Sequence, residues 1–102
     1  MTLHITGIRA QGREARVQLQ HVAFVDANGM AVPVARVDNP RGDSPGNEQP
    51  SNLLRPDNSK WLDGNFQRNG NQTTLVFHLQ QPALIAAYVL TTANDVPERD
   101  PV

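Results

Sequence analysis

The stretch PALIAAYVLTT, residues 82–92, constrains the fold of this chain more than any other part of the sequence. Every position from 84 to 90 is apolar, so the alternating sets that include Ile85 and Tyr88 are both apolar. Tyr, Val and Thr favour strands over helices. A strand that is apolar on both faces is typical of the centre of a sheet with cover on each side. The remaining chain, or another one, must provide that cover.

Period-two alternation of apolar residues also dominates elsewhere, which predicts an all-β protein. Strands are expected over residues 3–8, 17–24, 30–34 and 73–79. The alternation shifts phase between Leu19 and Val22, and a β-bulge at Gln20 or His21 would explain the shift. The pair Asn28-Gly29 predicts a hairpin turn between the second and third of these strands.

Size and composition limit the classes of function. A chain of 102 residues fits one domain, residues 1–102, with one core. Its net charge of -1 provides no electrostatic footprint for nucleic acid, so such a partner is not expected. No stretch reaches the ~20 apolar residues of a membrane helix, so membrane insertion is not expected either. Cysteine is absent, which excludes disulfides and thiolate zinc sites.

Residues 38–57 form a segment rich in Pro, Gly, Asn and Ser. Such a long segment without strand patterning predicts a functional loop or a loop packed on the end of the domain. The only tryptophan, Trp61, follows it. Core packing is favoured over ligand stacking for this ring. Phe66, in a connection rich in Gly and Asn, is the apolar residue expected to be exposed.

Three carboxylates near the end of the chain, Asp95, Glu98 and Asp100, raise the question of a hydrolytic carboxylate pair or a calcium loop. The favoured interpretation is a turn stabilised by ion pairs, because Asp95 follows a strand and Arg99 is close in sequence. Two interpretations are also open for the basic group Arg9, Arg13 and Arg16. It could bind an anion or lie in a solvated hairpin, and the hairpin is favoured.

No pattern of catalytic residues is visible. The histidines His4, His21 and His78 lack metal-ligand spacing, and His78 is expected to be a solvated or hydrogen-bonded strand residue. No serine lies in a Gly-x-Ser-x-Gly elbow. The chain is therefore predicted not to be an enzyme.

Three segments, taken in order, resemble a known family: VQLQHVAFVDANGMAVP, NLLRPDNSKWLD and TTLVFHLQQPALIAAYVLTTANDVPERDP. They are similar to the discoidin-like galactose-binding domains, relatives of the coagulation factor C-type domains and of many bacterial carbohydrate-binding modules. The likeness spans about Leu3 to Pro101, and its most specific parts are KWLD and the segment from Tyr88 to Pro101. It implies an antiparallel jelly-roll β-sandwich of the galactose-binding-like type, with binding loops at one end.

The resemblance also implies that strands are missing. In such domains the segment similar to ANDVPERDP is a turn, followed by a strand that begins with tryptophan and by further strands that complete both sheets. The sequence reaches Val102 before any of them. The sandwich is therefore expected to be incomplete, with an unpaired edge and an uncovered face on the strand over residues 84–90. A second copy, a strand-donating partner or further polypeptide would complete it.

Many members of this family bind a structural calcium ion in the loop before the tryptophan, through an Asp-Gly-Asp/Asn run followed by Thr or Ser. Here Arg55 and Pro56 stand at the first two positions, and only Asp57 and Ser59 match ligand types. A guanidinium in place of a carboxylate would substitute its own charge for that of the metal. No cofactor is therefore predicted, although Asp57 and Ser59 are the candidate metal ligands.

The leading hypothesis is a non-catalytic recognition module that binds a glycan or a protein surface through loops at one end, including residues 38–52. The alternative is a structural subunit completed by strands from a partner or a second copy. The sequence fixes no compartment, and a secreted or cell-surface location is favoured. The candidate ligand-binding residues are Asn39, Arg41, Asn47, Asn52 and Trp61.

Overall fold

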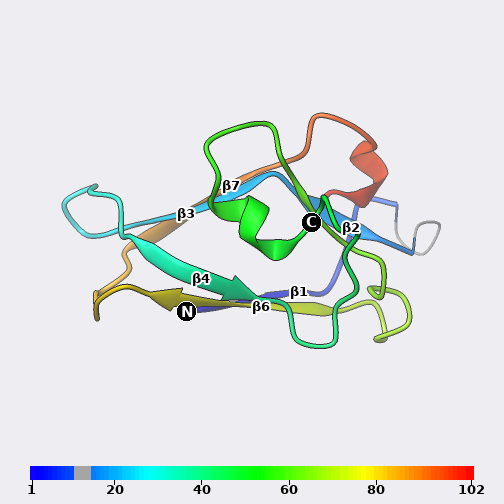
Figure 1. Ribbon diagram of the computed structural model, residues 1–102, viewed down its shortest axis with the longest axis horizontal. Coiled ribbons are helices and arrows are strands. Elements are labelled where there is room, and N and C mark those ends of the chain that lie inside the picture. The colour runs from blue at the N-terminus through cyan, green and yellow to red at the C-terminus, as the bar shows by residue number, and fades with distance from the viewer. Residues whose placement is uncertain (11–14) are drawn as a thin grey trace.

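β-Strands make up nearly all of the regular structure. The computed structural model describes residues 1–10 and 15–102. Within these ranges the only helices are two short 3-10 turns, so the all-β prediction is confirmed (Figure 1). The elements are β1 (Thr2–Ile5), β2 (Val17–Leu19), β3 (His21–Val25), β4 (Val34–Asp38), η1 (Pro50–Leu54), β5 (Trp61–Asp63), β6 (Thr73–Leu79), β7 (Ala87–Thr91) and η2 (Pro97–Arg99).

The strands pair antiparallel in three small sheets. One sheet has the order β1-β6-β4, and the others are the pairs β2-β5 and β3-β7. Figure 1 shows β3 and β7 in one layer and β4, β6 and β1 in the layer opposite. The core lies between the layers, where the rings of Phe24 and Phe77 meet edge to face with centroids 4.9 Å apart.

Strand β6 is the central strand of its sheet and follows the sequence prediction. Its burial alternates as expected, because Thr73, Leu75 and Phe77 are buried while Thr74 and Val76 are only partly covered. The β4–β6 register shifts between Val34 and Arg36, so β4 carries a local irregularity that the sequence did not reveal.

The irregularity predicted at Gln20 or His21 is present. The backbone N–H of Gln20 donates to the Thr91 carbonyl at 2.9 Å, and His21 is the register partner of the same Thr91. Two residues of one strand therefore oppose one residue of the other, which defines a bulge. The chain also changes neighbours here, from β5 alongside β2 to β7 alongside β3.

The predicted Asn28-Gly29 turn is confirmed. Gly29 has φ +77°, and its N–H donates to the Asp26 carbonyl at 3.0 Å. The Asp26 carboxylate accepts the N–H groups of Asn28 and Met30. The returning strand is shorter than predicted, because Ala31 makes an isolated bridge with Val25 and the chain then crosses to the opposite layer as β4.

Strand β7 has the unpaired edge and the uncovered face expected of an incomplete sandwich, and it is not the central, covered strand that its apolar pattern alone indicates. It pairs with β3 alone, and all five of its residues are exposed. Tyr88 and Val89 are each 54% exposed. The alternation of apolar residues correctly indicates a strand, but cover on its two faces depends on other strands, and the described residues place none there.

Two aromatic residues in the second half of the chain lie in the core. Trp61 is 0% exposed, as its favoured interpretation predicted. The prediction that Phe66 is exposed is wrong, because this ring is 1% exposed. The Asn71 N–H donates to the Phe66 carbonyl at 3.0 Å, and the Gln67 N–H donates to the Ala15 carbonyl at 3.2 Å. These bonds fold the connection back on the domain and turn Phe66 inward.

Candidate functional site

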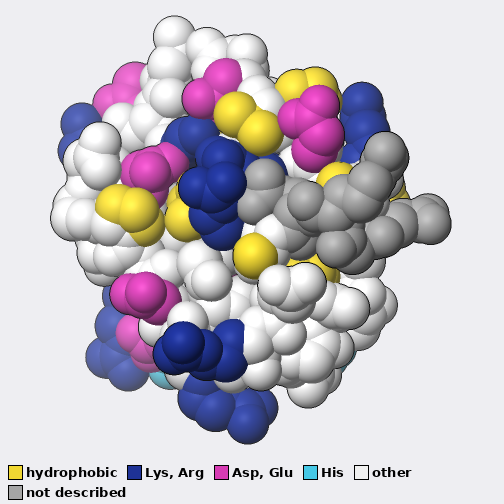
Figure 2. All heavy atoms as spheres, turned by 90° about the vertical axis from the view of Figure 1, so that its right-hand side faces the viewer, with side chains coloured by type: hydrophobic (Ala, Val, Ile, Leu, Met, Phe, Trp, Pro, Cys, Tyr) yellow, Lys and Arg dark blue, Asp and Glu magenta, His cyan; other side chains and the backbone are white. Residues whose placement is uncertain are grey.

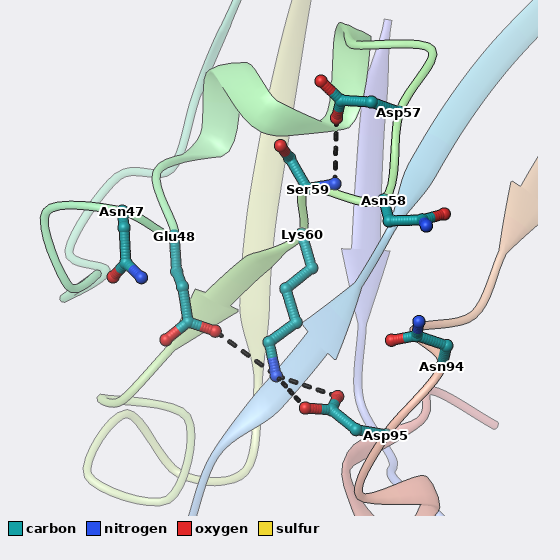
Figure 3. A pocket seen from close by; sticks show the side chains of 8 residues that line it. All are labelled: Asn47, Glu48, Asp57, Asn58, Ser59, Lys60, Asn94 and Asp95. Atoms are coloured by element: carbon teal, nitrogen blue, oxygen red, sulfur yellow. Dashed lines mark hydrogen bonds and ion pairs between the residues drawn. The ribbon is translucent and has the colours of Figure 1, made fainter.

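A polar cavity of about 570 Å³ opens where three segments that are distant in sequence meet. They are residues 47–48, residues 57–60 and the turn at residues 94–95 that follows β7 (Figure 3). Every lining residue has a polar side chain. The lining consists of Asn47, Glu48, Asp57, Asn58, Ser59, Lys60, Asn94 and Asp95.

Lys60 organises this cavity. Its Nζ lies 2.9 Å from Asp95 Oδ1, 3.0 Å from Asp95 Oδ2 and 3.3 Å from Glu48 Oε2 (Figure 3). The hydrogen bond from Lys60 is the main reason that the pKa of Asp95 falls below its usual value. The lysine side chain is only 18% exposed, and its ammonium is shared between the carboxylates of Glu48 and Asp95.

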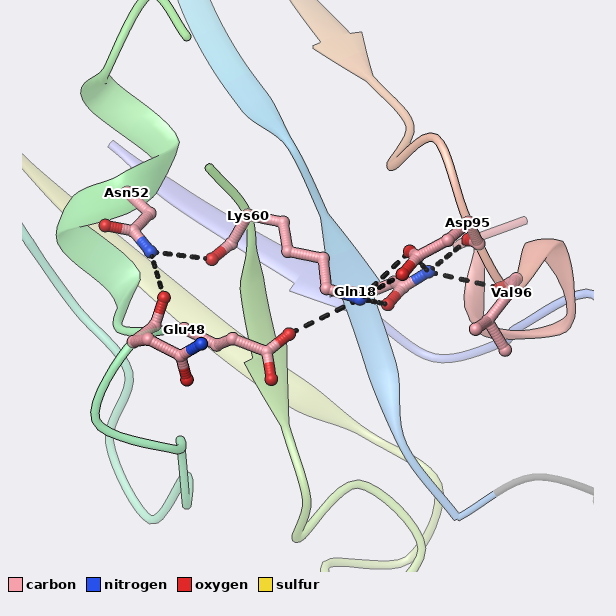
Figure 4. Close-up of polar contacts among 7 residues, drawn as sticks. Gln18, Glu48, Asn52, Lys60, Asp95 and Val96 are labelled. Carbon is pink, nitrogen blue, oxygen red and sulfur yellow. Dashed lines mark hydrogen bonds and ion pairs between the residues drawn. The ribbon is translucent and has the colours of Figure 1, made fainter. Parts of the chain in front are cut away.

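Gln18 supports Lys60 from within the domain. Its side chain is completely buried, and its Oε1 accepts a 2.8 Å hydrogen bond from Lys60 Nζ. Its Nε2 donates to the carbonyls of Asp95, at 2.7 Å, and Val96, at 3.1 Å (Figure 4). Gln18 therefore joins β2 to the turn after β7. Sequence reasoning missed it, and the only available signal was a polar residue between Val17 and Leu19.

The predicted ligand residues divide between the cavity and its surroundings. Asn47 lines the cavity. Asn52 supports it, because its Nδ2 donates to the carbonyls of Asn47, at 2.9 Å, and Lys60, at 2.8 Å. This amide fixes the distance between the two loops that carry Asn47 and Lys60 (Figure 4).

The other three predicted residues lie away from the cavity. Asn39 Nδ2 donates to Thr73 Oγ1 and to the Thr74 carbonyl, both at 2.9 Å, and Asn39 Oδ1 accepts from the indole of Trp61 at 3.3 Å. The buried Trp61 ring offers no surface to a ligand. Arg41 is exposed at φ 61°, and its carbonyl accepts hydrogen bonds from two asparagine side chains. The structure thus does not gather these residues into one site.

Asp57 and Ser59, the candidate metal ligands, are adjacent, but the carboxylate is already engaged. Asp57 Oδ2 lies 3.0 Å from Arg55 Nη2, and Asp57 Oδ1 accepts the Ser59 N–H at 2.9 Å. Hydrogen bonds from Ser59 and then the Arg55 charge lower the Asp57 pKa. No three His, Asp or Glu side chains of the described ranges gather as metal ligands. With a guanidinium on its only carboxylate, this donor set does not fit calcium.

The carboxylates at residues 95–100 do not converge on one point. The turn and the ion pairing predicted here are present: Lys60 lies 2.9 Å from Asp95 Oδ1, and the Arg99 charge also contributes to the lowered pKa of Asp95. Asp100 is buried, lies 3.5 Å from Arg9 Nη2 and has its pKa raised by that burial. Arg9 is thus paired with Asp100, whereas Arg13 of the predicted basic group lies outside the described residues.

His78, the third histidine in the sequence, forms a hydrogen bond with a carboxylate. His78 Nε2 lies 2.8 Å from Asp38 Oδ2 on the exposed face of β6 and β4, as expected of a hydrogen-bonded strand histidine.

Basic and acidic side chains are interspersed over the face shown in Figure 2. Neither helix in the described ranges has the length and hydropathy needed to cross a membrane.

Three asparagines at the rim provide the free hydrogen-bonding groups of the cavity. Asn47, Asn58 and Asn94 are exposed, and within the described part of the chain their side-chain amides have no protein partner (Figure 3). A second hollow of about 240 Å³ shares Asp57 and Asn58 with the cavity and adds His21, Arg55 and Thr91 to the polar surface. The cavity and this hollow therefore form one extended, open polar surface.

Comparison of the chain with protein-family models, curated protein sequences and solved structures finds no match.

Proposed function

We propose that this chain is a non-catalytic recognition module of the discoidin-like type that binds a neutral glycan in the cavity around Lys60. The observation that supports this function is the set of three unpartnered carboxamides, those of Asn47, Asn58 and Asn94, around one cavity. Each carboxamide offers two donors and one acceptor oxygen. Neighbouring hydroxyl groups of a sugar ring present the complementary set.

The size of the cavity suits a small polar ligand. Its volume of about 570 Å³ falls in the range of roughly 300–1,000 Å³ that is usual for small-molecule sites. The hollow that shares Asp57 and Asn58 extends the surface, so a glycan longer than one residue has room to continue toward His21. The resemblance to galactose-binding-like domains points to the same ligand class and to the same use of loops at one end of a β-domain.

The charges of the cavity favour a neutral ligand. Three carboxylates, Glu48, Asp57 and Asp95, line it together with one ammonium, that of Lys60. The ammonium already donates to Gln18 Oε1 and to both Asp95 oxygens, so its three N–H groups have partners and none is left for an additional anion. Asp57 is paired with Arg55, while Glu48 and Asp95 share the one ammonium. The lining therefore offers a sialic or uronic acid no unpaired cation, and its carboxylates disfavour another negative charge. The same argument disfavours phosphate groups.

A glycan array with the full chain tests this function. Neutral glycans are expected to bind, and sialylated or uronate-containing glycans are expected to bind more weakly. Asn58→Ala and Asn94→Ala should each weaken binding about 2- to 10-fold, since each removes one net hydrogen bond of about 0.5–1.5 kcal/mol.

Asn28→Ala is the matched control, because Asn28 is an exposed asparagine in the β3 hairpin and does not line the cavity. Its affinity should equal that of the wild type. If no glycan binds, or if the two cavity variants bind as tightly as the control, the proposed function is wrong.

A further inference from the structure

Strand β7 presents a free edge with properties that are unusual for a soluble protein. Its five residues are exposed, and within residues 1–10 and 15–102 it pairs with β3 on one side only. No charged residue occurs from Gln80 to Asn94. Exposed edge strands are normally protected by charges, prolines or bulges. Between Ala87 and Thr91 the sequence provides no charge and no proline.

The face of β7 that is directed toward the core carries apolar side chains that the rest of the described chain covers only in part. Tyr88 is in register with Phe24, and Leu90 is in register with Val22. Directly opposed residues of an antiparallel pair project from the same face. Phe24 and Val22 are buried, whereas Tyr88 is 54% and Leu90 37% exposed. Two large apolar side chains therefore extend the core-facing surface into solvent.

The backbone groups at the free edge can be assigned from the hairpin. The Phe24 carbonyl accepts the Val32 N–H at 2.8 Å, so the polar groups of Phe24 point away from β7. Because these groups alternate sides along a strand, His21, Ala23 and Val25 bond toward β7, where their partners are Thr91, Val89 and Ala87. The N–H and C=O groups of Tyr88 and Leu90 consequently point toward the free edge.

We infer that a second copy of this chain pairs with this edge, antiparallel and symmetric about Val89. In that register Tyr88 of one copy opposes Leu90 of the other, and the outward N–H and C=O groups of both residues find partners. Val89 opposes Val89 of the second copy. A two-fold interface needs a strand that is complementary to itself, and an uncharged strand with this arrangement of donors and acceptors meets that requirement.

The symmetric arrangement also explains the choice of a second copy over an unlike strand. A partner strand that carried charges would place them against Tyr88 or Leu90, on surface that is apolar on both faces. A copy of β7 places only Tyr, Val, Leu, Ala and Thr there. This interface goes beyond the proposed glycan site, and the residues of β7 that form it do not line the cavity around Lys60.

Sedimentation equilibrium of the whole chain tests the inference. The wild-type mass should rise with concentration from 11.2 kDa toward twice that value. Val89→Lys and Val89→Glu should each remain monomeric, because side chains directly opposed across a non-hydrogen-bonded pair lie about 4.5–5.5 Å apart at Cβ and like charges there repel. An equimolar mixture of the two variants should restore dimers through the opposite charges.

Met30→Lys is the matched control, since Met30 is 64% exposed in the hairpin at the far end of β3. It should dimerise as the wild type does, and circular dichroism should show that all three variants keep the fold. Three outcomes would each overturn the inference: a wild type that stays monomeric at millimolar concentration, a Val89→Lys variant that still dimerises, or a mixture of variants that stays monomeric.

Discussion

At the scale of single residues, Asp63 does more for the loops than its sequence context suggests. Its carboxylate is completely buried at the end of β5. Oδ1 accepts the N–H groups of Asp43, at 3.0 Å, and Asn65, at 2.8 Å, and Oδ2 accepts the Thr73 hydroxyl at 2.6 Å. A buried charge is tolerated when hydrogen bonds compensate it. Asp63 thereby joins two loops to β6.

Replacement of this residue should be strongly destabilising. Asp63→Asn puts an NH₂ group where one oxygen accepts a hydrogen bond, and hydrogen bonds to charged groups contribute about 1.5–3 kcal/mol each. We expect the free energy of unfolding, measured in urea, to fall by about 3 kcal/mol. Asp43→Asn is the control, because the Asp43 side chain is exposed and only its backbone N–H takes part. Equal stability of the two variants would contradict this role.

The residues that the sequence predicted correctly are those whose role depends on near neighbours. The Asn28-Gly29 turn and the buried Trp61 belong to this group. The roles of Gln18 and Asp63 and the burial of Phe66 were missed because each depends in part on a contact with a distant segment. Gln18, for instance, contacts Asp95 across a sequence separation of 77. For the same reason the sequence indicated Asn47 and missed Lys60 at the centre of the site.

At the scale of elements, alternation predicted where strands occur but not which strands pair. Strand β6 has the predicted extent, Thr73–Leu79. The segment over residues 17–24 splits into β2 and β3, which have different partners. Strand β7 has the apolar pattern of a central strand and yet lies at an edge. Periodicity is a property of one segment, whereas pairing and cover depend on the arrangement of all of them.

The hairpin between β3 and Ala31 provides a test of backbone conformation alone. A Cβ at Gly29 or at Gly46 would meet nothing within 4 Å, but only Gly29 of these two has a positive φ, +77°. Gly29→Ala should lower the free energy of unfolding by about 1 kcal/mol, because an L-residue is strained in this region. Gly46→Ala should leave stability unchanged or raise it by about 0.4–1 kcal/mol. A larger loss at Gly46 than at Gly29 would refute this account of the turn.

At the scale of the whole molecule, one polar network holds together the segments that surround the cavity. Glu48 lies in the long loop over residues 38–57, and Lys60 directly precedes β5. Gln18 belongs to β2, and Asp95 lies in the turn after β7 (Figure 4). These segments are not neighbours in sequence. The network fixes the geometry of the cavity, so conditions that break the Lys60–Asp95 pair should loosen both the site and the C-terminal segment.

Acid should break this pair, and the shift in the pKa of Asp95 gives the direction in which stability changes with pH. Folding lowers this pKa below its ordinary value of 3.8. The stabilisation is therefore fully present above about pH 3.8 and is lost as the pH falls through the lower, folded-state pKa. Asp95→Asn should reduce the free energy of unfolding at pH 7 by about 0.2–1 kcal/mol, since the Asp95 side chain is 52% exposed. The difference from the wild type should vanish in acid.

Asp100 should show the opposite dependence on pH, which makes it the internal control for that experiment. Burial raises its pKa above 3.8, and its Oδ1 has no hydrogen-bond partner among the residues that the structure describes. The protonated form is thus favoured in the folded state, and the associated stability is present below pH 3.8 and lost as the pH rises through the folded-state pKa. Relative to the wild type, Asp100→Asn should gain stability as the pH increases from 3 to 7, whereas Asp95→Asn should lose it. Urea unfolding at several pH values separates the two trends. Parallel curves for the two variants would contradict the opposite directions of the two pKa shifts.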